Sequence, residues 1–497
     1  MRKNVVIIGG GIGGLAAGCY LRRNGYSTRI IEMGRECGGV SVPWNRGEYC
    51  FDGATNWLPG SSPGINIHDL IAELIDFADG TVDEFDEFMR IEDGDEAFRV
   101  YTDLHKLKKE MLRIAPEDEG VITEFIDAVL HLSRLNIPFD QSPDLMSFPE
   151  LVLFPVRNAR MILFFLKWKK MTIREFAARF TNSRMRAMIQ QILPHHEFFS
   201  LLALMMPLSW LHCKSAGYPH GGSRSFIDRL AAVYRDAGGE IILNTRVTGL
   251  CTDRDTATGV MCADGSRYDA DIVISAADRY ETIVNLCGGR YMNPAIKKQF
   301  RSYRVFPAML QISLGIARTF DNEPHKMVIP FAAPLALGND TEKTLLLRIC
   351  NFDDCFAPEG KTALVVHLRT HDWQYWVDLR NNDRKRYENE KVRVSGAVID
   401  TLDKRFGGIR DACEVSDVAT PATYMRYTNV WKGSYQGWAP TPAVIGRSLK
   451  RTLPGLKNFY CTGQWLSPAG GLPRVIVLGR QVAQRICKDD GKAFIAR

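Results

Sequence analysis

The chain has 497 residues, of which 45% are hydrophobic, 24% charged and 10% aromatic. These fractions are typical of a globular protein and exclude disordered, collagen-like and coiled-coil chains. The length exceeds what one hydrophobic core supports, so we expect at least two lobes. The 63 Lys and Arg residues against 57 Asp and Glu residues leave a net charge of +6. That surplus is too mild to indicate a nucleic-acid-binding protein, and we expect no nucleic-acid partner.

The twelve cysteines are scattered and form no C-x-x-C pair. No Cys/His spacing suits zinc, and the adjacent His195 and His196 do not match H-E-x-x-H, so we expect no metal site. Scattered thiols in a chain this long are typical of a reducing compartment. We therefore expect a cytoplasmic protein.

The N-terminus has the pattern of a dinucleotide-binding unit. Residues 5–8 are a β-branched run that predicts a strand buried on both faces, and residues 9–14 read G-G-G-I-G-G before a helical pattern. In this G-x-G-x-x-G fingerprint Gly9 permits the tight turn, Gly11 lets the backbone approach a pyrophosphate, and Gly14 lets helix and strand pack closely. The N-terminus of the helix then favours the phosphate charge.

A second predicted strand, residues 28–31, ends at Glu32. An acidic residue at this place accepts hydrogen bonds from an adenosine ribose and disfavours NADP. The following pair, Gly38-Gly39, resembles the glycine-pair extension of glutathione-reductase-type FAD proteins, although Val40 stands where that family usually has Arg. No second G-x-G-x-x-G opens a helix elsewhere, so we expect FAD and no built-in NAD(P)H domain.

Further elements are predicted along the chain. They are a Phe51-Asp52-Gly53 element, a hairpin over 88–101 turning at Asp93-Gly94, helices over 104–135 interrupted near Pro116, a helix over 226–237, strands at 240–243 and 271–278, and a D-G hairpin over 260–268. Alternating strands are expected to dominate from about 295 to 440. The C-terminus repeats the order of a strand, a glycine-rich segment and a helix starting near Val475.

Residues 151–186 combine apolar runs with nine basic residues and one acid, Glu175. The charge of 157–186 alone exceeds the total of the chain. The stretch is too short and too charged to span a bilayer. Two interpretations remain open: a helix on an anionic membrane surface, which would make the protein peripheral to a membrane, or an internal helical lobe whose basic residues face solvent.

These motifs together resemble the phytoene desaturase family, which includes carotenoid desaturases, carotenoid isomerases and retinol saturases. The resemblance rests on the fingerprint with Glu32, the Phe51-Asp52-Gly53 element, the Thr420 to Tyr427 motif and the Gly463 to Pro473 terminus, and it covers essentially the whole chain in order. Arg474 stands where many members have Gly. The resemblance implies one FAD and an apolar tunnel for an isoprenoid or lipid-like substrate.

The implied fold is α/β, with a Rossmann-type FAD-binding domain of the glutathione-reductase kind, split in sequence, and an inserted α+β substrate lobe. We expect the FAD domain in residues 1–75, 217–290 and 445–497, and the substrate lobe in 76–216 and 291–444. The residues expected to contact FAD are Gly9, Gly11, Ile12, Gly13, Gly14, Glu32, Met33, Arg35, Gly38, Gly39, Val247, Gly463, Gly470, Gly471 and Leu472.

The expected reaction is a desaturase-like hydride transfer from a carbon chain to flavin N5. Trp57 and Tyr435 lie in motifs expected near the ring, more as walls of the pocket than as proton-transfer groups. A reduced-flavin cis–trans isomerase or saturase remains an alternative. An amine-oxidase-like enzyme and a non-catalytic prenyl or lipid carrier remain alternatives of other classes. The oligomeric state is not predicted.

Overall fold

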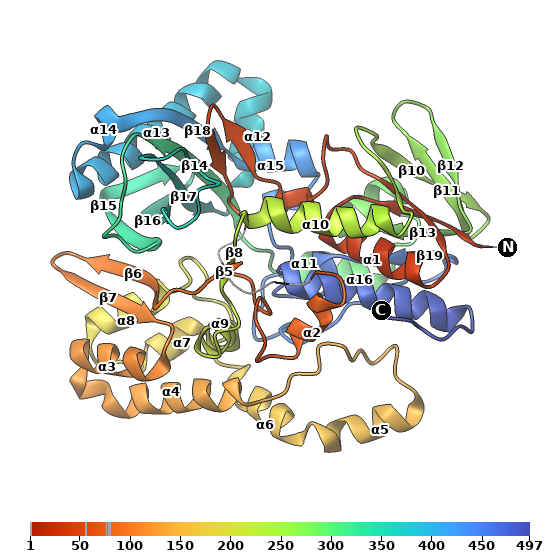
Figure 1. Cartoon of the computed structure of the whole chain (residues 1–497), viewed down its shortest axis with the longest axis horizontal. Coiled ribbons are helices and arrows are strands. Elements are labelled where there is room, and N and C mark those ends of the chain that lie inside the picture. Colours follow the sequence, from red (N-terminus) through yellow and green to blue (C-terminus); the bar gives the residue numbers. More distant parts are fainter. Residues whose placement is uncertain (1, 55–56, 76, 78–80) are drawn as a thin grey trace.

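The computed structural model describes residues 2–54, 57–75, 77 and 81–497. Within these residues, one parallel sheet joins strands that are far apart in sequence (Figure 1). Its order is β19 (Phe459–Cys461), β13 (Ile272–Ser275), β1 (Asn4–Ile8), β2 (Ser27–Ile31) and β9 (Glu240–Ile242). The strands predicted at 5–8, 28–31, 240–243 and 271–278 are confirmed.

Both faces of this sheet are covered. On one face Ile7 and Ile274 pack against helices, and these helices are α1 (Ile12–Arg23), α10 (Gly222–Asp236) and α16 (Leu472–Asp489). On the other face Ile8 and Val273 pack against a three-stranded antiparallel sheet made of β10 (Val247–Asp253), β11 (Thr256–Cys262) and β12 (Arg267–Asp269). Burial on both sides explains the continuous β-branched run, because a parallel strand has no solvent face.

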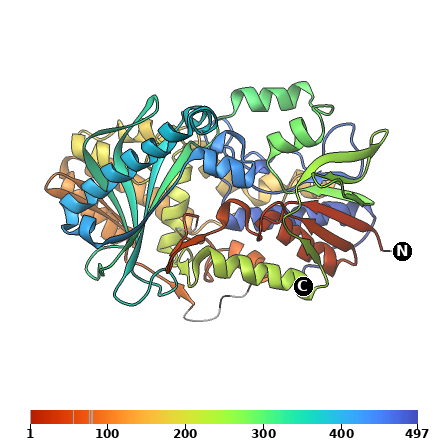
Figure 2. The ribbon, with the colours of Figure 1, turned by 90° about the horizontal axis from the view of Figure 1, so that it is seen from above.

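A second, seven-stranded sheet lies beside the first (Figures 1 and 2). Its order is β18 (Cys413–Ala419), β14 (Ala308–Ile316), β17 (Thr362–Thr370), β16 (Asp340–Cys350), β15 (Lys326–Leu337), β6 (Glu87–Asp93) and β7 (Glu96–Tyr101). Neighbouring strands are antiparallel except for β15 and β6, which run parallel. The predicted hairpin over 88–101 is confirmed as β6–β7.

The expectation of alternating strands from 295 to 440 was wrong for part of that range. Helices interrupt it, namely α11 (Pro294–Ser302), α12 (Trp373–Asn382), α13 (Arg384–Phe406), α14 (Ile409–Ala412) and α15 (Pro421–Thr428). Trp376, Val394 and Leu402 of these helices pack on one face of the seven-stranded sheet. The sheet needs this cover because an apolar face must be buried against another element.

A helical lobe lies under both sheets in Figure 1. It consists of α3 (Leu104–Ile114), α4 (Glu119–Ser133), α5 (Phe148–Arg157), α6 (Ala159–Trp168), α7 (Ile173–Ala177), α8 (Ser183–Gln190) and α9 (Leu202–His212). The break predicted near Pro116 separates α3 from α4. Short elements complete the fold, namely α2 (Ile67–Ala72), the pair β3 (Trp44–Arg46) and β4 (Tyr49–Phe51), and the pair β5 (Val82–Asp83) and β8 (Tyr218–Pro219).

The predicted fold class is therefore confirmed as an α/β unit with a parallel sheet and an α+β lobe built around a second sheet. The residue boundaries proposed for the domains stay a prediction. In the described part of the chain, no helix is long and apolar enough to cross a bilayer.

Candidate functional site

Two glycine loops meet at the carboxyl end of β1. The N–H of Gly38 donates to the carbonyl of Gly10 at 3.0 Å, and a side-chain carbon placed on Gly39 would lie 3.6 Å from Cα of Gly11. Such a carbon on Gly14 would lie 2.1 Å from the carbonyl oxygen of Gly9, so only glycine permits this helix–strand packing. Around Gly11, by contrast, the nearest 4 Å are open. The loop thus offers free space directly before the N-terminus of α1.

Glu32 follows β2 and is buried beside these loops. Its two carboxylate oxygens accept one backbone N–H each, from Gly10 at 2.6 Å and from Gly34 at 2.7 Å. Burial raises the pKa of the Glu32 carboxyl, against the lowering by these backbone hydrogen bonds. Because a carboxylate oxygen accepts more than one hydrogen bond, both oxygens can also accept from ribose hydroxyls.

Three more of the predicted contacts lie near Glu32. Met33 and Arg35 lie in the bend that follows, with the Arg35 side chain exposed. The N–H of Thr245 donates to the Glu32 carbonyl at 2.9 Å, which brings the start of β10, and with it Val247, close to Glu32.

The C-terminal glycines also lie near the carboxyl end of β1. A side-chain carbon on Gly13 would lie 3.1 Å from Cα of Gly463 and 3.0 Å from Val475. Gly471 has φ +89° and precedes the first turn of α16, which begins at Leu472 rather than near Val475. Pro473 explains the earlier start, because proline is favoured in the first turn of a helix. The N-termini of α1 and α16 therefore meet beside one space.

This arrangement fits a dinucleotide cofactor. Two helix N-termini and glycine loops favour a pyrophosphate, and Glu32 favours a ribose. The chain also matches a family model, described as flavin containing amine oxidoreductase, over residues 12–487.

The chain belongs to this flavin-containing family. It is an FAD-dependent oxidoreductase.

Similar proteins support the assignment over the full length. The chain is 25% identical to a 4,4'-diapophytoene desaturase (4,4'-diapolycopene-forming) of Methylomonas sp, covering 97% of this chain and 95% of that one. It is also 25% identical to a chloroplastic prolycopene isomerase of Arabidopsis thaliana, covering 98% and 83%. The crystal structure of an oxidoreductase from Methanosarcina mazei shares the fold, with a TM-score of 0.61, 14% identity and coverage of 98% and 100%.

The element Phe51-Asp52-Gly53 joins the flavoprotein's two sheets. The Asp52 carboxylate accepts from the N–H of Ser223 at 2.7 Å, at the start of α10. Arg348 of β16 donates to the Asp52 carbonyl. A side-chain carbon on Gly53 would collide with Gln311 of β14. The element thus holds the cofactor side of the molecule against one face of the seven-stranded sheet.

That face carries polar side chains, most of them buried, which the sequence pattern did not predict. Its members alternate with the apolar residues of the opposite face, and they are Gln311, Ser313, Lys326, Arg348, His367 and Arg369. Alternation of this kind normally marks a solvent face, so nothing in the sequence distinguishes it. Burial, together with the nearby Arg348 and Arg369, lowers the pKa of Lys326 to about 7.

The two candidate catalytic residues lie against cations of this face. The Lys326 ammonium lies 4.9 Å from the ring centre of Trp57, and the Arg369 guanidinium lies 4.9 Å from that of Tyr435. The Tyr435 hydroxyl is 3.4 Å from Nε2 of His196, and burial raises the tyrosine pKa and holds that of His196 well below its usual range.

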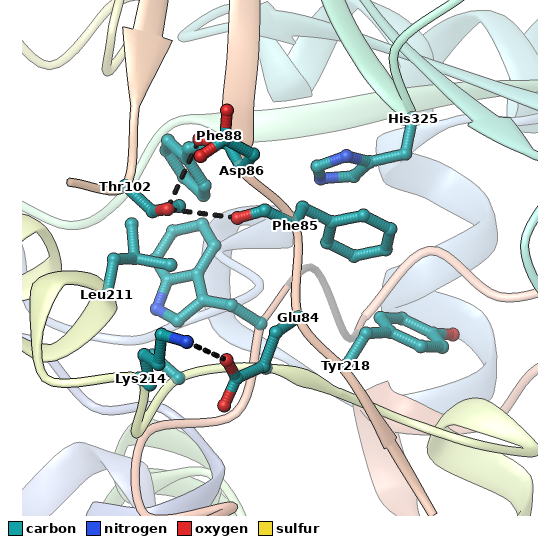
Figure 3. A pocket seen from close by; sticks show the side chains of 12 residues that line it. Glu84, Phe85, Asp86, Phe88, Thr102, Leu211, Lys214, Tyr218 and His325 are labelled. Carbon is teal, nitrogen blue, oxygen red and sulfur yellow. Dashed lines mark hydrogen bonds and ion pairs between the residues drawn. The ribbon is translucent and has the colours of Figure 1, made fainter. Parts of the chain in front are cut away.

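A cavity of about 230 Å³ (Figure 3) is lined in part by the two rings that the Lys326 ammonium contacts. Trp57, Phe88, Tyr218 and His325 are among its walls. The Lys326 ammonium lies 4.2 Å from the ring centre of Phe88. At the rim Lys214 and Glu84 form an ion pair of 3.8 Å. The cavity belongs to the sheet side of the site, since the glycine loops do not line it.

Proposed function

We propose that this oxidoreductase acts on a carbon–carbon bond of an apolar, isoprenoid- or lipid-like substrate. The relatives named as a desaturase and an isomerase support this substrate class. One observation supports placing the reaction between the cofactor cradle and the polar sheet face. A side-chain carbon on Gly470 or on Gly471 would lie within 3.5 Å of Gln436, and the next residue, Tyr435, lies on Arg369. The flavin end of the cradle and the polar sheet face therefore meet.

The proposed cofactor contacts are those predicted from the sequence. FAD, when bound, supplies a two-electron acceptor or donor. The protein must hold the carbon chain in a fixed pose and exclude water, which side chains such as Trp57, Phe88, Phe306 and Tyr435 can do. Phe306 and Tyr435 pack edge to face at 5.5 Å, and Trp57 and Phe88 at 5.2 Å. We propose that Trp57 and Tyr435 act as walls.

Other activities receive less support. An amine substrate is suggested by the name of the family model, but a protonated amine is repelled by a face that carries Lys326, Arg348 and Arg369. A lipid carrier has no use for the open cradle at Gly11. Isomerisation or saturation uses the same geometry and differs from desaturation only in net electron flow.

We also propose that α5 and α6 contact an anionic membrane surface. Of the eleven large hydrophobic side chains that are exposed in the described part of the chain, seven lie in residues 148–166. Figure 1 places these two helices along the lower edge of the molecule. Arg160, Lys169 and Lys170 flank this apolar surface, and the described residues offer them no ion-pair partner. Exposed apolar and cationic groups together favour such a surface.

The stretch 171–186 has a different environment. Phe176 and Met185 are buried in the helical lobe. Arg174 pairs with Glu197, and Arg179 pairs with Glu124. This half therefore fits the internal-lobe interpretation, and the membrane proposal is confined to 148–170.

The test is anaerobic mixing of the oxidised holoenzyme with isoprenoids, sterols and fatty acyl compounds while the flavin absorbance is followed. Bleaching supports desaturation of the compound that causes it. Product from pre-reduced enzyme without net bleaching supports isomerisation. Purified protein that releases no FAD, or bleaching by amines alone, would overturn the proposal.

A further inference from the structure

The cavity in Figure 3 lies between the helical lobe and the second sheet. Its apolar walls are mostly aromatic, and they are Trp57, Phe85, Phe88, Leu211, Ala216 and Tyr218. Its volume of about 230 Å³ is smaller than the roughly 300–1,000 Å³ of a site that encloses a whole ligand. The cavity therefore suits one end of a larger apolar molecule.

The charged side chains that line this cavity are paired. Glu84 and Lys214 form an ion pair of 3.8 Å, and the Asp86 carboxylate accepts from the Lys106 ammonium at 2.7 Å. A charged end group finds no free counter-ion among these lining side chains, and burying a charge without one is costly. A neutral end group meets no such cost.

The imidazole of His325 has no partner in this wall. The residue is 6% exposed, and its ring stacks on Phe85 with 3.7 Å between the ring centres. Figure 3 shows the imidazole extending from the start of β15 toward Asp86 and Phe88. Within the described part of the chain, neither ring nitrogen of His325 forms a hydrogen bond or an ion pair.

The environment of His325 keeps its ring neutral. Burial, together with the nearby Lys326 and Arg348, holds the pKa of His325 well below its usual range. A neutral imidazole offers one N–H donor and one nitrogen acceptor. A buried polar group that loses water without gaining a partner destabilises the protein, so a ligand that supplies the hydrogen bond is favoured. A hydroxyl group fits either ring nitrogen, because it both donates and accepts.

The helix α9 leads from this cavity toward the cofactor side. It is apolar on almost every side, which is typical of a helix surrounded by other groups. Its 11 residues give a length of about 16 Å. One face of it stays only partly buried, and its members at positions i, i+3, i+4 and i+7 are Ala203, Met206, Pro207 and Trp210.

The two ends of α9 lie at the two candidate wall residues. Before the helix, Nε2 of His196 is 3.4 Å from the Tyr435 hydroxyl. At its end, Leu211 lies one turn beyond Pro207 and lines the cavity together with Trp57. The partly buried face of α9 therefore offers a carbon chain an apolar path between the cavity and Tyr435.

We propose that this cavity binds a hydroxyl group at one end of an otherwise apolar substrate, with His325 as its hydrogen-bond partner and the aromatic walls around the adjoining carbons. The proposal rests on the proposed function, because the rest of the substrate runs along α9 to Tyr435 and the flavin. The bound end then fixes which carbon–carbon bond lies at the flavin.

The experiment measures binding to the holoenzyme by isothermal titration calorimetry. The ligands share one isoprenoid or alkyl chain, are used below their micelle concentrations, and end in an alcohol, a methyl group or a carboxylate. We expect the alcohol to bind about fivefold more tightly than the methyl-ended ligand, which is the size of one neutral hydrogen bond. The carboxylate should bind no more tightly than the methyl-ended ligand.

Variants separate His325 from the rest of the cavity. His325→Phe keeps a ring on Phe85 and removes the hydrogen bond, so it should lose the preference for the alcohol and keep the affinity for the methyl-ended ligand within about twofold. His105→Phe, the same substitution at an exposed position of α3, is the control and should keep the preference. If the larger ring prevents folding, His325→Leu makes the same comparison.

The other outcomes contradict the proposal. Equal binding of the alcohol and the methyl-ended ligand to the wild type overturns the end-group assignment, while the apolar-substrate proposal stands. Tightest binding of the carboxylate shows that the end group is charged. A His325 variant that keeps the preference shows that the hydroxyl binds elsewhere. If no ligand of the series binds, the end-group assignment and the proposed function both fail.

Discussion

The guanidinium carbon of Arg369 lies 4.9 Å from the ring centre of Tyr435. The cation is attracted by the face of the ring, and this attraction grows as water is excluded. We propose that Tyr435 acts through its ring and not through its hydroxyl group, since the ring holds the guanidinium where the cofactor side and the sheet face meet.

A first prediction therefore separates the ring of Tyr435 from its hydroxyl. Burial raises the pKa of this tyrosine and keeps its neighbour His196 neutral, so the pair is poorly suited to exchange a proton. Tyr435→Phe should keep the rate of flavin reduction within about threefold, whereas Tyr435→Leu should lose more than about tenfold. Stopped-flow absorbance with any substrate that bleaches the flavin measures both. A loss of a hundredfold or so in Tyr435→Phe would instead make the phenol a proton-transfer group.

A second prediction contrasts two glycines of the fingerprint. Alanine at position 11 meets no atom within 4 Å, but its methyl group enters the space before α1. Gly11→Ala should fold with an unchanged melting temperature of the apoprotein and bind FAD weakly. Gly14→Ala pushes a carbon against the Gly9 carbonyl and should cost about 1–3 kcal/mol of folding free energy.

Circular dichroism of the apoproteins and titration with FAD measure the two effects. Gly120→Ala is the matched control, because position 120 lies in an exposed helix turn with open space around it. It should change neither FAD affinity nor stability appreciably. An FAD affinity of Gly11→Ala equal to that of the wild type would show that the pyrophosphate does not approach this loop.

A third prediction concerns pH. Burial, with Arg348 and Arg369 nearby, lowers the pKa of Lys326 from 10.5 to about 7. Between these values the unfolded chain binds a proton that the folded chain does not, so folding becomes more favourable as pH rises. Below pH 7 both states are protonated and the cost of the buried charge is fully present.

The free energy of unfolding of the wild type, minus that of Lys326→Met, should therefore increase from pH 7 to 9, by at most about 1.4 kcal/mol per pH unit. Urea unfolding of the ligand-free holoenzymes at several pH values measures this difference. The exposed-site variant Lys343→Met should run parallel to the wild type over this range. A difference that is flat or falls with pH would mean that Lys326 stays protonated in the folded protein.

A fourth prediction tests α5 and α6 as a membrane contact. The triple variant Arg160→Glu, Lys169→Glu and Lys170→Glu should abolish sedimentation with vesicles that contain phosphatidylserine, because it reverses the charge beside the exposed apolar side chains. Lys167 is left unchanged because it lies 3.4 Å from Glu124. Lys297→Glu with Lys298→Glu, on exposed positions of α11, is the control and should sediment like the wild type. Unchanged sedimentation of the triple variant would favour helices that merely face solvent.

Much of the cofactor site could be predicted from the sequence, because its requirements are local. The spacing of Gly9, Gly11 and Gly14 describes one turn, and Glu32 follows one strand. Local patterns did not predict α13, a 23-residue helix within a range of expected strands. The burial of this helix depends on the sheet that it covers, which is distant in sequence.

The amino-acid sequence by itself determined the strand–glycine–helix units at both ends of the chain, because turns and close helix packing depend on neighbouring residues. Only the tertiary structure decided that Ile272–Ser275 and Phe459–Cys461 pair beside Asn4–Ile8, since parallel pairing joins distant segments. The tertiary structure also decided the environment of the side chains of Lys326, His367 and Arg369. On a strand with one wet face these residues would be ordinary surface groups. The packing of the other lobes over that face buries Lys326 and His367 and lowers the pKa of both side chains.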